Sequence, residues 1–489
     1  MEDRPSLALL TDLYQLTMAQ GYLLAGRAED EAVFHLFFRK PPFGGGYTVA
    51  CGLNDVVAYL DTLYFSEDDL EYLRSLLADD GTPLFTERFL ARLEAFSLHL
   101  DIDAVPEGTV VFAHEPLLRV RGPILEAQLL ETTLLNLVNF QTLVATKAAR
   151  VCAAAQGDPV LEFGLRRAHG VDGALAASRA AYVGGCAATS NVMAGKRFGI
   201  PVRGTHAHSW VMSFESEPAA FAAWAEAMPN NTVFLVDTYD SLSGVKHAIE
   251  AGRWLEQHGH RLLGVRLDSG DLAWLSIEAR KLLDAAGFLD AVIVASNDLD
   301  EHLIESLKHQ GAAIAVWGVG TRLVTAYDQP ALGGVYKLSA VRPPGGGPWH
   351  HRVKLSEQAA KISTPGVQQV RRFRDPQTGL YVADVIYDEE LGVPAPVTFV
   401  DPRDPLRRRT LPATLESEDL LVPVVRGGRR AYEPPTAGKA RARTAAQLAA
   451  LSPSSRRLQN PHEYPVGLEA RLAELRTRLV LEARAAVQR

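Results

Sequence analysis

The stretch from residue 159 to residue 321 repeats one pattern, in which a short apolar run is followed by a segment of helical periodicity. The strand-like runs lie at 159–164, 200–208, 232–240, 261–271, 291–298 and 313–321. The helical segments between them lie at roughly 179–197, 216–227, 241–258, 271–286 and 299–310. Strands that alternate with helices predict a parallel sheet, because a parallel pair of strands needs a long crossover connection.

Two α/β architectures fit this alternation, an open sheet and a barrel. The apolar runs VFLV, AVIVA and AIAV are typical of strands that are buried on both faces. Six units follow in succession, and no GxGxxG turn opens the series, which favours a barrel over a nucleotide-binding open sheet. We therefore predict a TIM-like, irregular α/β barrel at 156–340.

The segments on either side of the predicted barrel have a different pattern. Residues 1–155 predict an α+β domain that begins with a helix at 7–26 and ends with a long bridging helix at 124–153. Residues 341–489 predict a C-terminal portion with return strands and a terminal helix. The basic run at 426–443 is interpreted as a solvated loop, because it has few aromatic residues for stacking on bases.

Composition excludes some classes of partner. The chain has 489 residues, 47% of them hydrophobic, and a net charge of -8, which argues against general binding to nucleic acid or to an anionic membrane. No run approaches the roughly 18 apolar residues of a membrane span. The three cysteines (Cys51, Cys152 and Cys186) form no CxxC pair, so we expect a cytoplasmic protein without a structural zinc site.

Polar residues stand where the predicted strands end, and in a barrel these ends form the active-site face. They are Arg166, His206, His208, Asp237, Arg266, Asp268, Ser296, Asn297, Gly318 and Gly320. Helix capping is the alternative explanation for Asp237, Ser269 and Asn297, since each precedes a predicted helix. Capping does not explain Arg266, and the set as a whole indicates an anionic substrate with a metal ion or hydroxyl groups.

A possible phosphate site lies after the last strand-like run. Gly318 and Gly320 allow backbone N–H groups to come close to a ligand, and Thr321 adds a hydroxyl group. The GxGT pattern is weak by itself, but phosphate sites often follow the late strands of barrels.

Several motifs, in order along the chain, resemble those of nicotinate phosphoribosyltransferase, a type II phosphoribosyltransferase family. They are LLTDLYQLTM, EFGLRRAHG, GTHAHSW, VDTYDSLSG, VRLDSGDL, ASNDLD, VWGVGTRL, KLSEQAAKISTPG and NPHEYPV. The resemblance covers nearly the whole chain, and only residues 404–451 carry no motif of the family.

The resemblance implies transfer of a 5-phosphoribosyl group from phosphoribosyl pyrophosphate to nicotinate, with ATP as co-substrate and Mg²⁺ as cofactor. In this family ATP phosphorylates a histidine, and the pattern GTxAHS places that role on His208. An unprotonated imidazole is a competent nucleophile for this step. The role of His206 stays open.

The resemblance also implies roles around the base and the ribose. Phe163 stacks on the pyridine ring, Arg166 binds a carboxylate or phosphate, and Tyr14 covers the ring from the partner subunit of a homodimer. Further substrate-binding positions are Ser190, Thr205 and Ser209. Asp237, Arg266 and Asp268 match the catalytic positions at the ribose and pyrophosphate, and either aspartate could meet the metal. The product phosphate is assigned to Ser296, Asn297, Gly318, Gly320 and Thr321.

Three interpretations follow. The first is a nicotinate enzyme, and Ser190 favours it because the nicotinamide-using relatives have an acidic residue there, which would repel a carboxylate. The second is a related enzyme that uses nicotinamide or quinolinate; the GTHAHS turn argues against quinolinate. The third is a protein that binds a phosphorylated pyridine without turnover, and it would not need His208.

Overall fold

A computed structural model describes residues 6–356 and 362–487, and the chain forms two compact units. The first unit comprises residues 1–143, 331–435 and 443–489, and the second comprises residues 144–330 and 436–442. The N-terminal and C-terminal segments that the sequence separates therefore share one unit. Part of the predicted motif at 354–366 lies outside the described residues, namely 357–361.

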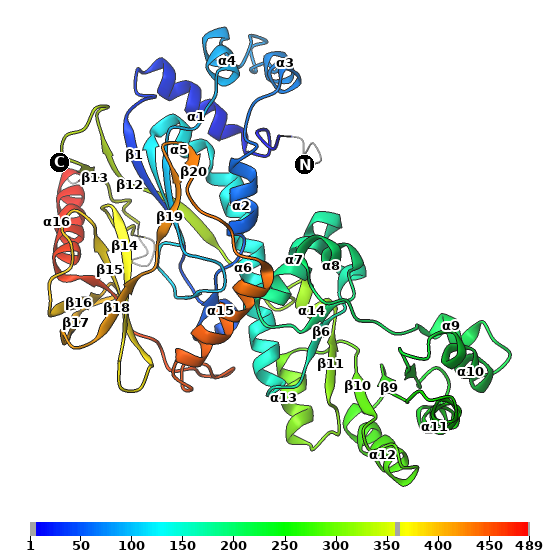
Figure 1. The fold of residues 1–489 in the computed structure, drawn as a ribbon. Coiled ribbons are helices and arrows are strands. Elements are labelled where there is room, and N and C mark those ends of the chain that lie inside the picture. Colours follow the sequence, from blue (N-terminus) through cyan, green and yellow to red (C-terminus); the bar gives the residue numbers. More distant parts are fainter. Residues whose placement is uncertain (1–5, 357–361, 488–489) are drawn as a thin grey trace. The chain divides into compact units, whose positions relative to one another are not determined.

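The second unit contains the alternating strands and helices (Figure 1). Its strands are β6 (Val160–Glu162), β7 (Ala188–Thr189), β8 (Val233–Leu235), β9 (Gly264–Leu267), β10 (Val292–Ala295) and β11 (Val316–Val319). Its helical elements are η2 (Leu165–Arg167), α7 (Gly170–Val183), α8 (Val192–Phe198), α9 (His208–Met212), α10 (Glu217–Ala227), α11 (Ser241–Gln257), α12 (Leu272–Ala285), α13 (Glu301–His309) and α14 (Thr321–Val324). The expected α/β fold is confirmed.

The predicted closed barrel is not observed. The strands lie in the order β7-β6-β11-β10-β9-β8, and every pairing between them is parallel. This is the circular order of a barrel that has been cut between β7 and β8. In the part of the chain that the structure describes, these two edge strands do not pair with each other, so the sheet stays open at that seam.

The seam has a physical reason in residues 200–208, which the sequence predicts as a strand. Only Val202 forms a bridge, to Thr189, and the following residues have no strand geometry. His206 instead inserts its side chain, and the Leu235 N–H on β8 donates to Nε2 of His206 at 3.3 Å. A side chain thus satisfies an edge N–H group that a neighbouring strand would otherwise bond.

The helix predicted at 179–197 is also wrong. Residues 170–183 and 192–198 form separate helices, α7 and α8, and the two-residue strand β7 lies between them. Gly185 ends the first helix region with φ 127°, a conformation that favours glycine. The short strand carries no alternation of apolar and polar residues, so the periodicity of the sequence does not reveal it.

The first unit contains two large, mainly antiparallel sheets, a small sheet and the helices around them. Its N-terminal elements are α1 (Leu13–Leu24), β1 (Glu31–Phe38), η1 (Pro42–Gly44), β2 (Thr48–Val49), α2 (Leu53–Leu60), α3 (Glu67–Ser75), α4 (Glu87–Glu94), β3 (Asp101–Ala104), β4 (Val110–Val111), β5 (Leu118–Pro123) and α5 (Ile124–Leu129). Strands β2 and β4 form the small sheet. Helix α6 (Glu131–Ala154) continues from this unit into the second.

The C-terminal part of the chain completes both large sheets. Its elements are β12 (Gly334–Arg342), β13 (His350–His351), β14 (Gln368–Arg374), β15 (Tyr381–Asp388), β16 (Val397–Asp401), β17 (Asp404–Leu411), β18 (Glu416–Asp419), β19 (Val422–Arg426), β20 (Arg429–Arg430), α15 (Ala437–Ala450), β21 (Val466–Glu469) and α16 (Ala470–Val487). The large sheets have the orders β13-β12-β1-β5-β3-β19-β20 and β17-β16-β21-β15-β14-β18.

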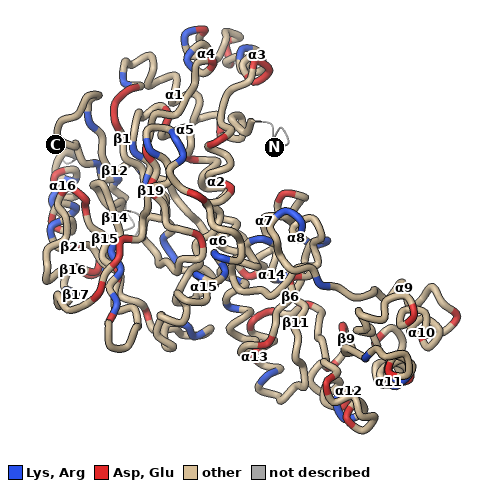
Figure 2. The backbone as a smooth tube through the Cα atoms, in the orientation of Figure 1, with Lys and Arg blue, Asp and Glu red and all other residues tan. Residues whose placement is uncertain are grey.

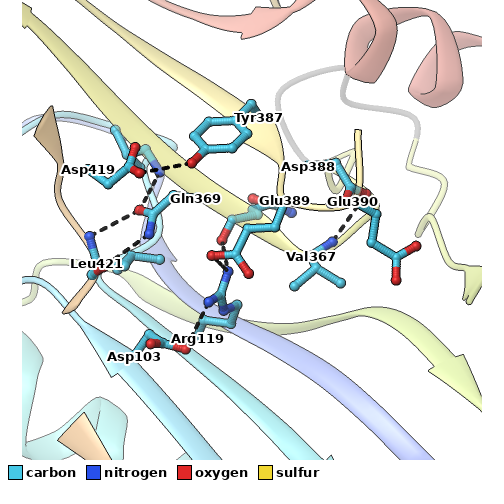
Figure 3. A network of polar contacts seen from close by, with 12 residues as sticks. Asp103, Arg119, Val367, Gln369, Tyr387, Asp388, Glu389, Glu390, Asp419 and Leu421 are labelled. Atoms are coloured by element: carbon cyan, nitrogen blue, oxygen red, sulfur yellow. Dashed lines mark hydrogen bonds and ion pairs between the residues drawn. The ribbon is translucent and has the colours of Figure 1, made fainter. Parts of the chain in front are cut away.

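A polar network joins the two large sheets of the first unit (Figure 3). Arg119 on β5 is buried and forms ion pairs with Asp103 at 2.8 Å and with Glu389 at 2.9 Å. Its Nη1 also donates to the Gln368 carbonyl on β14 at 3.0 Å. Gln369 exchanges two hydrogen bonds with the Leu421 backbone, both 3.0 Å long. The charged groups at the centre of this network thus compensate one another.

Three predicted elements of the first unit need correction. The helix predicted at 7–26 begins only at Leu13, and the helix predicted at 124–153 is divided into α5 and α6. The basic run at 426–443 is not a loop, since it contributes to β19, β20 and α15. Figure 2 shows acidic and basic residues interspersed along α16, where Arg478 lies 3.9 Å from Glu482. Among the described residues, the structure has no helix with the length and apolar character that a membrane span requires.

Candidate active site

The candidate site lies at the carboxyl ends of the parallel strands. The residues that cap the following helices show whether its polar residues serve as helix caps or are free to bind a ligand. Helices α11, α12 and α13 are capped by Asp240, Asp271 and Asp300, whose side chains accept hydrogen bonds from backbone N–H groups. Capping therefore does not account for Asp237, Ser269 or Asn297, which lie nearer to the strand ends. Their side chains are available for other contacts.

Asp237 follows β8 and is the centre of the cluster. Its Oδ2 accepts from the Asp268 N–H at 2.8 Å and from the Ser269 hydroxyl at 2.6 Å. Its Oδ1 is buried and has no hydrogen-bond partner among the described residues. A buried carboxylate oxygen without a donor is costly unless a ligand compensates it.

His208 is the first residue of helix α9 and is partly exposed. Its Nδ1 lies 3.1 Å from the Thr238 hydroxyl oxygen, which is hydrogen-bond distance. Its Nε2 faces Oδ2 of Asp268 at 3.8 Å, too far for a hydrogen bond but close enough for electrostatic attraction. The other Asp268 oxygen, Oδ1, accepts a hydrogen bond from the Ser296 hydroxyl. The nearest carboxylate to the imidazole is therefore that of Asp268.

Arg266 on β9 brings a positive charge to the same strand ends. Its Nη1 donates to the Thr205 hydroxyl at 2.7 Å, and its Nε is buried without a partner among the described residues. Burial lowers the pKa of Arg266, and the nearby charge of Arg166 acts in the same direction. Arg166 itself is exposed in η2 and makes no hydrogen bond or ion pair with any described residue. The two guanidinium groups are thus close and only partly compensated, as suits an anionic ligand.

Phe163 explains two glycines at the end of β11, Gly318 within the strand and Gly320 just after it. A Cβ atom on Gly318 would lie 2.8 Å from the Phe163 ring, and one on Gly320 would lie 3.3 Å from the Phe163 carbonyl oxygen. The backbone pairs as well, since the Phe163 N–H donates to the Val319 carbonyl at 2.8 Å. Gly318 is therefore required for ring packing, independently of any phosphate.

The remaining phosphate candidates lie on neighbouring loops. Ser296 is buried, and Asn297 is exposed with φ 87°, a left-handed conformation that non-glycine residues rarely adopt. Thr321 begins the short helix α14. The Cβ of Ser296 would lie 3.4 Å from a Cβ on Gly318, so the two loops touch.

Three of the predicted residues make few side-chain contacts. Ser190 follows β7, and its N–H donates to the Glu162 carbonyl at 2.9 Å. Ser209 is exposed in the first turn of α9. Tyr14 belongs to the first unit and is 48% exposed, so nothing in that unit covers half of its surface.

His206 has a structural environment that differs from that of His208. It is buried, and its ring lies 5.0 Å from the Trp224 ring and 6.3 Å from the Phe234 ring, measured between centroids. Burial lowers the pKa of His206 to about 4. The imidazole is therefore neutral near pH 7, and it accepts the Leu235 N–H at the open seam of the sheet.

The donor set fits a magnesium ion only together with substrate oxygens. Among the described residues, no three His, Cys, Asp or Glu side chains converge as a metal site would require. Mg²⁺, however, is often held by one or two carboxylates plus phosphate oxygens and water. The unpartnered Oδ1 of Asp237 and the carboxylate of Asp268 provide that smaller set.

Comparisons with known proteins decide the family. Sequence models of nicotinate phosphoribosyltransferase match residues 9–139 as its N-terminal domain, 159–344 as the family domain and 367–476 as its C-terminal domain. A nicotinate phosphoribosyltransferase of Bacillus subtilis is 44% identical over 470 residues, which cover 95% of this chain and 93% of the relative. The chain belongs to the nicotinate phosphoribosyltransferase family.

Other members and structures agree. The nicotinate phosphoribosyltransferase of Homo sapiens is 38% identical over 525 residues, covering 96% of this chain and 95% of the relative. A crystal structure of human nicotinic acid phosphoribosyltransferase has a TM-score of 0.81 at 35% identity and covers 96% of this chain and 99% of that chain. A nicotinate-nucleotide pyrophosphorylase from Pyrococcus furiosus, with a TM-score of 0.66 at 21% identity, shares the fold.

The sequence reasoning missed Thr238. This residue lies between Asp237 and Tyr239 in VDTYDSLSG, and its hydroxyl contacts the imidazole of His208. A threonine after a strand is too common to indicate a site, so only the fold reveals this contact. The one available signal was its place beside Asp237 at the strand end.

Proposed function

We propose that this protein transfers the 5-phosphoribosyl group of phosphoribosyl pyrophosphate to nicotinate, with ATP as co-substrate, giving nicotinate mononucleotide and pyrophosphate for NAD biosynthesis. The proposed site lies in the segment 156–340, on an irregular barrel that is open between β7 and β8. One observation carries the proposal: His208 at the start of α9 and the strand-end residues Asp237 and Asp268 form a cluster whose side-chain polar atoms are not used as helix caps.

In the proposed reaction, His208 accepts the γ-phosphoryl group of ATP. A nitrogen–phosphorus bond forms while the bond to the β-phosphate oxygen breaks, and the electron pair of that bond leaves with ADP. The negative charge of Asp268 beside Nε2 favours the tautomer with the proton on Nε2. The lone pair then lies on Nδ1, which accepts from the Thr238 hydroxyl before ATP binds; this hydrogen bond orients the ring and is given up when Nδ1 attacks the γ-phosphorus. Asp268 and Thr238 thus hold the ring from both sides.

Transfer of the phosphoribosyl group creates positive charge at the ribose and negative charge on the departing pyrophosphate. The carboxylates of Asp237 and Asp268 would stabilise the cationic centre, and Arg266 would stabilise the pyrophosphate. When bound by Asp237 or Asp268, Mg²⁺ would neutralise part of the phosphate charge. The unpartnered Oδ1 of Asp237 and Nε of Arg266 support these roles.

Selectivity for an acid is assigned to the residues around the base. Phe163 offers a ring for stacking, and Arg166 offers a guanidinium group without a described protein partner for the substrate carboxylate or a phosphate. Ser190 adds no charge that would repel nicotinate. The one buried carboxylate nearby in the chain, Glu162, is satisfied by the Ser178 hydroxyl at 2.9 Å and by Thr189 and the Gly164 N–H. Thr205 and Ser209 complete the proposed substrate contacts.

The 5′-phosphate is assigned to the two touching loops after β10 and β11. Ser296, Asn297 and Thr321 supply side-chain donors, and the glycines allow the backbone to approach.

We also propose a homodimer, in which Tyr14 covers the base in the partner subunit's site. Helix α1 and the turn before it expose a row of large apolar side chains in the single chain. These are Leu7 at 40%, Leu10 at 45%, Leu13 at 52%, Tyr14 at 48% and Met18 at 42% exposed. Contiguous exposed apolar surface of this kind is typical of an interface.

One assay tests the proposed function. The purified protein is incubated with Mg²⁺, ATP, phosphoribosyl pyrophosphate and either nicotinate, nicotinamide or quinolinate, and nucleotide product is measured. We expect product with nicotinate and at most one hundredth as much with the other bases. Turnover of nicotinamide or quinolinate but not nicotinate would contradict the assignment, and binding without any turnover would indicate a binding protein.

A further inference from the structure

The two loops that carry the proposed phosphate ligands leave the sheet side by side. Strands β10 and β11 are parallel neighbours, and Ala295, the last residue of β10, pairs with Trp317 within β11. Ser296 and Asn297 begin the loop after β10, whereas Gly318 lies near the end of strand β11 and Gly320 and Thr321 form the connection from β11 to α14. The distance between these loops sets the size of any phosphate site between them.

One ion pair connects the loops a few residues further on. Oδ2 of Asp300 accepts a hydrogen bond from Nη1 of Arg322 at 2.7 Å. Arg322 directly follows Thr321, and its guanidinium also lies 4.9 Å from the centre of the Tyr327 ring. The Asp300 side chain is only 7% exposed, whereas that of Arg322 is 34% exposed.

The other oxygen of Asp300 has a separate task. Oδ1 accepts from the His302 N–H at 3.0 Å and from the Leu303 N–H at 2.8 Å, which caps helix α13. The cap is therefore complete without Arg322. Among the described residues, the corresponding caps of α11 and α12, Asp240 and Asp271, form no ion pair with an arginine of a neighbouring loop.

Stability explains part of the pair, because Asp300 is nearly buried and its charge needs a partner, but Arg322 is one-third exposed and water screens it. A better explanation is that the pair holds the segments after β10 and β11 in position. Helix α14 has only four residues and cannot hold its own orientation, and Asn297 keeps a left-handed φ of 87° that its surroundings must impose. Asp300 fixes the end of the segment that connects β10 to α13. Through its ion pair with Arg322, it also fixes α14, which follows β11.

We infer that Asp300 and Arg322 are positioning residues that hold the two phosphate-binding loops at the separation required by phosphoribosyl pyrophosphate. This inference rests on the proposed function, because it takes the loops to be the 5′-phosphate site. Neither residue needs to touch the substrate. Their loss would weaken binding of the phosphorylated substrate more than it would change the chemical step.

The decisive variant is Asp300→Asn, which keeps a good capping side chain but removes the charge that holds Arg322. We expect the KM for phosphoribosyl pyrophosphate to rise about tenfold, while the KM for nicotinate and kcat change by less than about twofold. The matched control is Asp271→Asn, which makes the same change at the cap of α12 and should leave all three constants unchanged. A thermal midpoint close to that of the wild type would show that α13 is still capped.

A second pair of variants separates positioning from direct contact. Arg322→Met should raise the same KM by a similar factor, Arg322→Lys should recover part of it, and Asp300→Asn combined with Arg322→Met should be no worse than either alone. An unchanged KM in Asp300→Asn would overturn the inference. An effect in Arg322→Met without one in Asp300→Asn would also overturn it, because it would place Arg322 on the phosphate itself. Absence of nucleotide synthesis in the wild type would instead refute the proposed function.

Discussion

The two compact units each contain a cluster of charged side chains, and the clusters differ in how completely their polar atoms are used. In the first unit, Arg119 pairs with Asp103 and Glu389 (Figure 3). Arg371 pairs with Asp419 at 2.8 Å. In the second unit, Oδ1 of Asp237 and Nε of Arg266 are buried without partners among the described residues.

This difference teaches how to distinguish a structural network from a site. Charges that compensate one another join elements of the fold, and substituting one of them should reduce stability. Polar atoms that the protein leaves unpartnered at converging strand ends have a cost that a ligand can remove. Arg119 also has a buried Nε without a partner, but its other nitrogens bind two carboxylates, so its charge is compensated.

The largest effect is expected for Asp237→Asn in the second unit. Loss of this carboxylate should lower kcat/KM about a thousandfold, roughly 4 kcal/mol of transition-state stabilisation, because it removes charge at the reacting ribose and a possible ligand of Mg²⁺. Steady-state kinetics checks this. The thermal midpoint should change little, since an amide oxygen can still accept from Asp268 and Ser269.

Asp240→Asn is the matched control for that variant. Asp240 lies three residues further along the chain and caps α11, a role that asparagine also fills. Its activity should equal that of the wild type. Equal losses of activity in both variants would mean that the loop as a whole, rather than the Asp237 carboxylate, is sensitive.

Arg119→Met tests the charged network of the first unit, which we expect to act on stability and not on catalysis. It leaves the exposed Glu389 without this ion pair and the buried Asp103 with only Arg426 as its partner, so the free energy of unfolding should fall by about 2 kcal/mol. The kcat of the folded protein should stay within twofold of the wild type. Urea unfolding and kinetics measure the two quantities, and Arg121→Met, on the same strand, is the control. A loss of kcat without a loss of stability would place this network in the active site.

A pH effect is expected from His206. Its folded-state pKa of about 4 lies below the ordinary histidine value, so between these values the unfolded chain binds a proton that the folded chain does not. The stability from the neutral ring is present above about pH 6.5 and is lost as the pH falls toward 4. Between pH 7 and pH 4 the wild type should lose about 3 kcal/mol more unfolding free energy than His206→Phe. If the unfolding free energies of the wild type and His206→Phe, measured with urea, changed equally with pH, the neutral state of the buried His206 ring would be contradicted.

The smallest effect is expected for Thr238→Val, which removes one hydroxyl beside His208 with little change in shape. Phosphoenzyme formation from ATP should slow about tenfold, because one hydrogen bond that orients the imidazole is lost. Rapid-quench measurement with labelled ATP checks the rate, and Thr238→Ser should restore most of it. No change in the valine variant would show that Asp268 alone orients the ring.

The sequence predicts the α/β class because its strands are apolar and its helices are long, but it misplaces the second strand. Residues 200–208 look like a strand, whereas the short β7 at 188–189 lies within a run of small residues that has no alternation. The open seam follows from this difference. Closure of a sheet depends on contacts between distant residues, such as that of His206 with Leu235, which periodicity does not contain.

The candidate site was more predictable than the fold's closure, because carboxyl ends of parallel strands meet at one edge. The contacts among Asp237, Asp268 and Ser296 follow from that rule. The sequence could not decide between capping and function, since the real caps, such as Asp240, lie only three residues further along. It also could not identify the carboxylate that faces His208, because Asp268 is sixty residues away in the chain.

The central claim is that His208, and not His206, is the phosphoryl acceptor. The direct measurement is the amount of acid-labile phosphate that the purified wild type, His208→Ala and His206→Ala retain after incubation with γ-labelled ATP and Mg²⁺. We expect close to one phosphate per chain in the wild type, none in His208→Ala and a substantial fraction in His206→Ala. Labelled phosphoenzyme in His208→Ala, or its loss in a folded His206→Ala alone, would contradict the account.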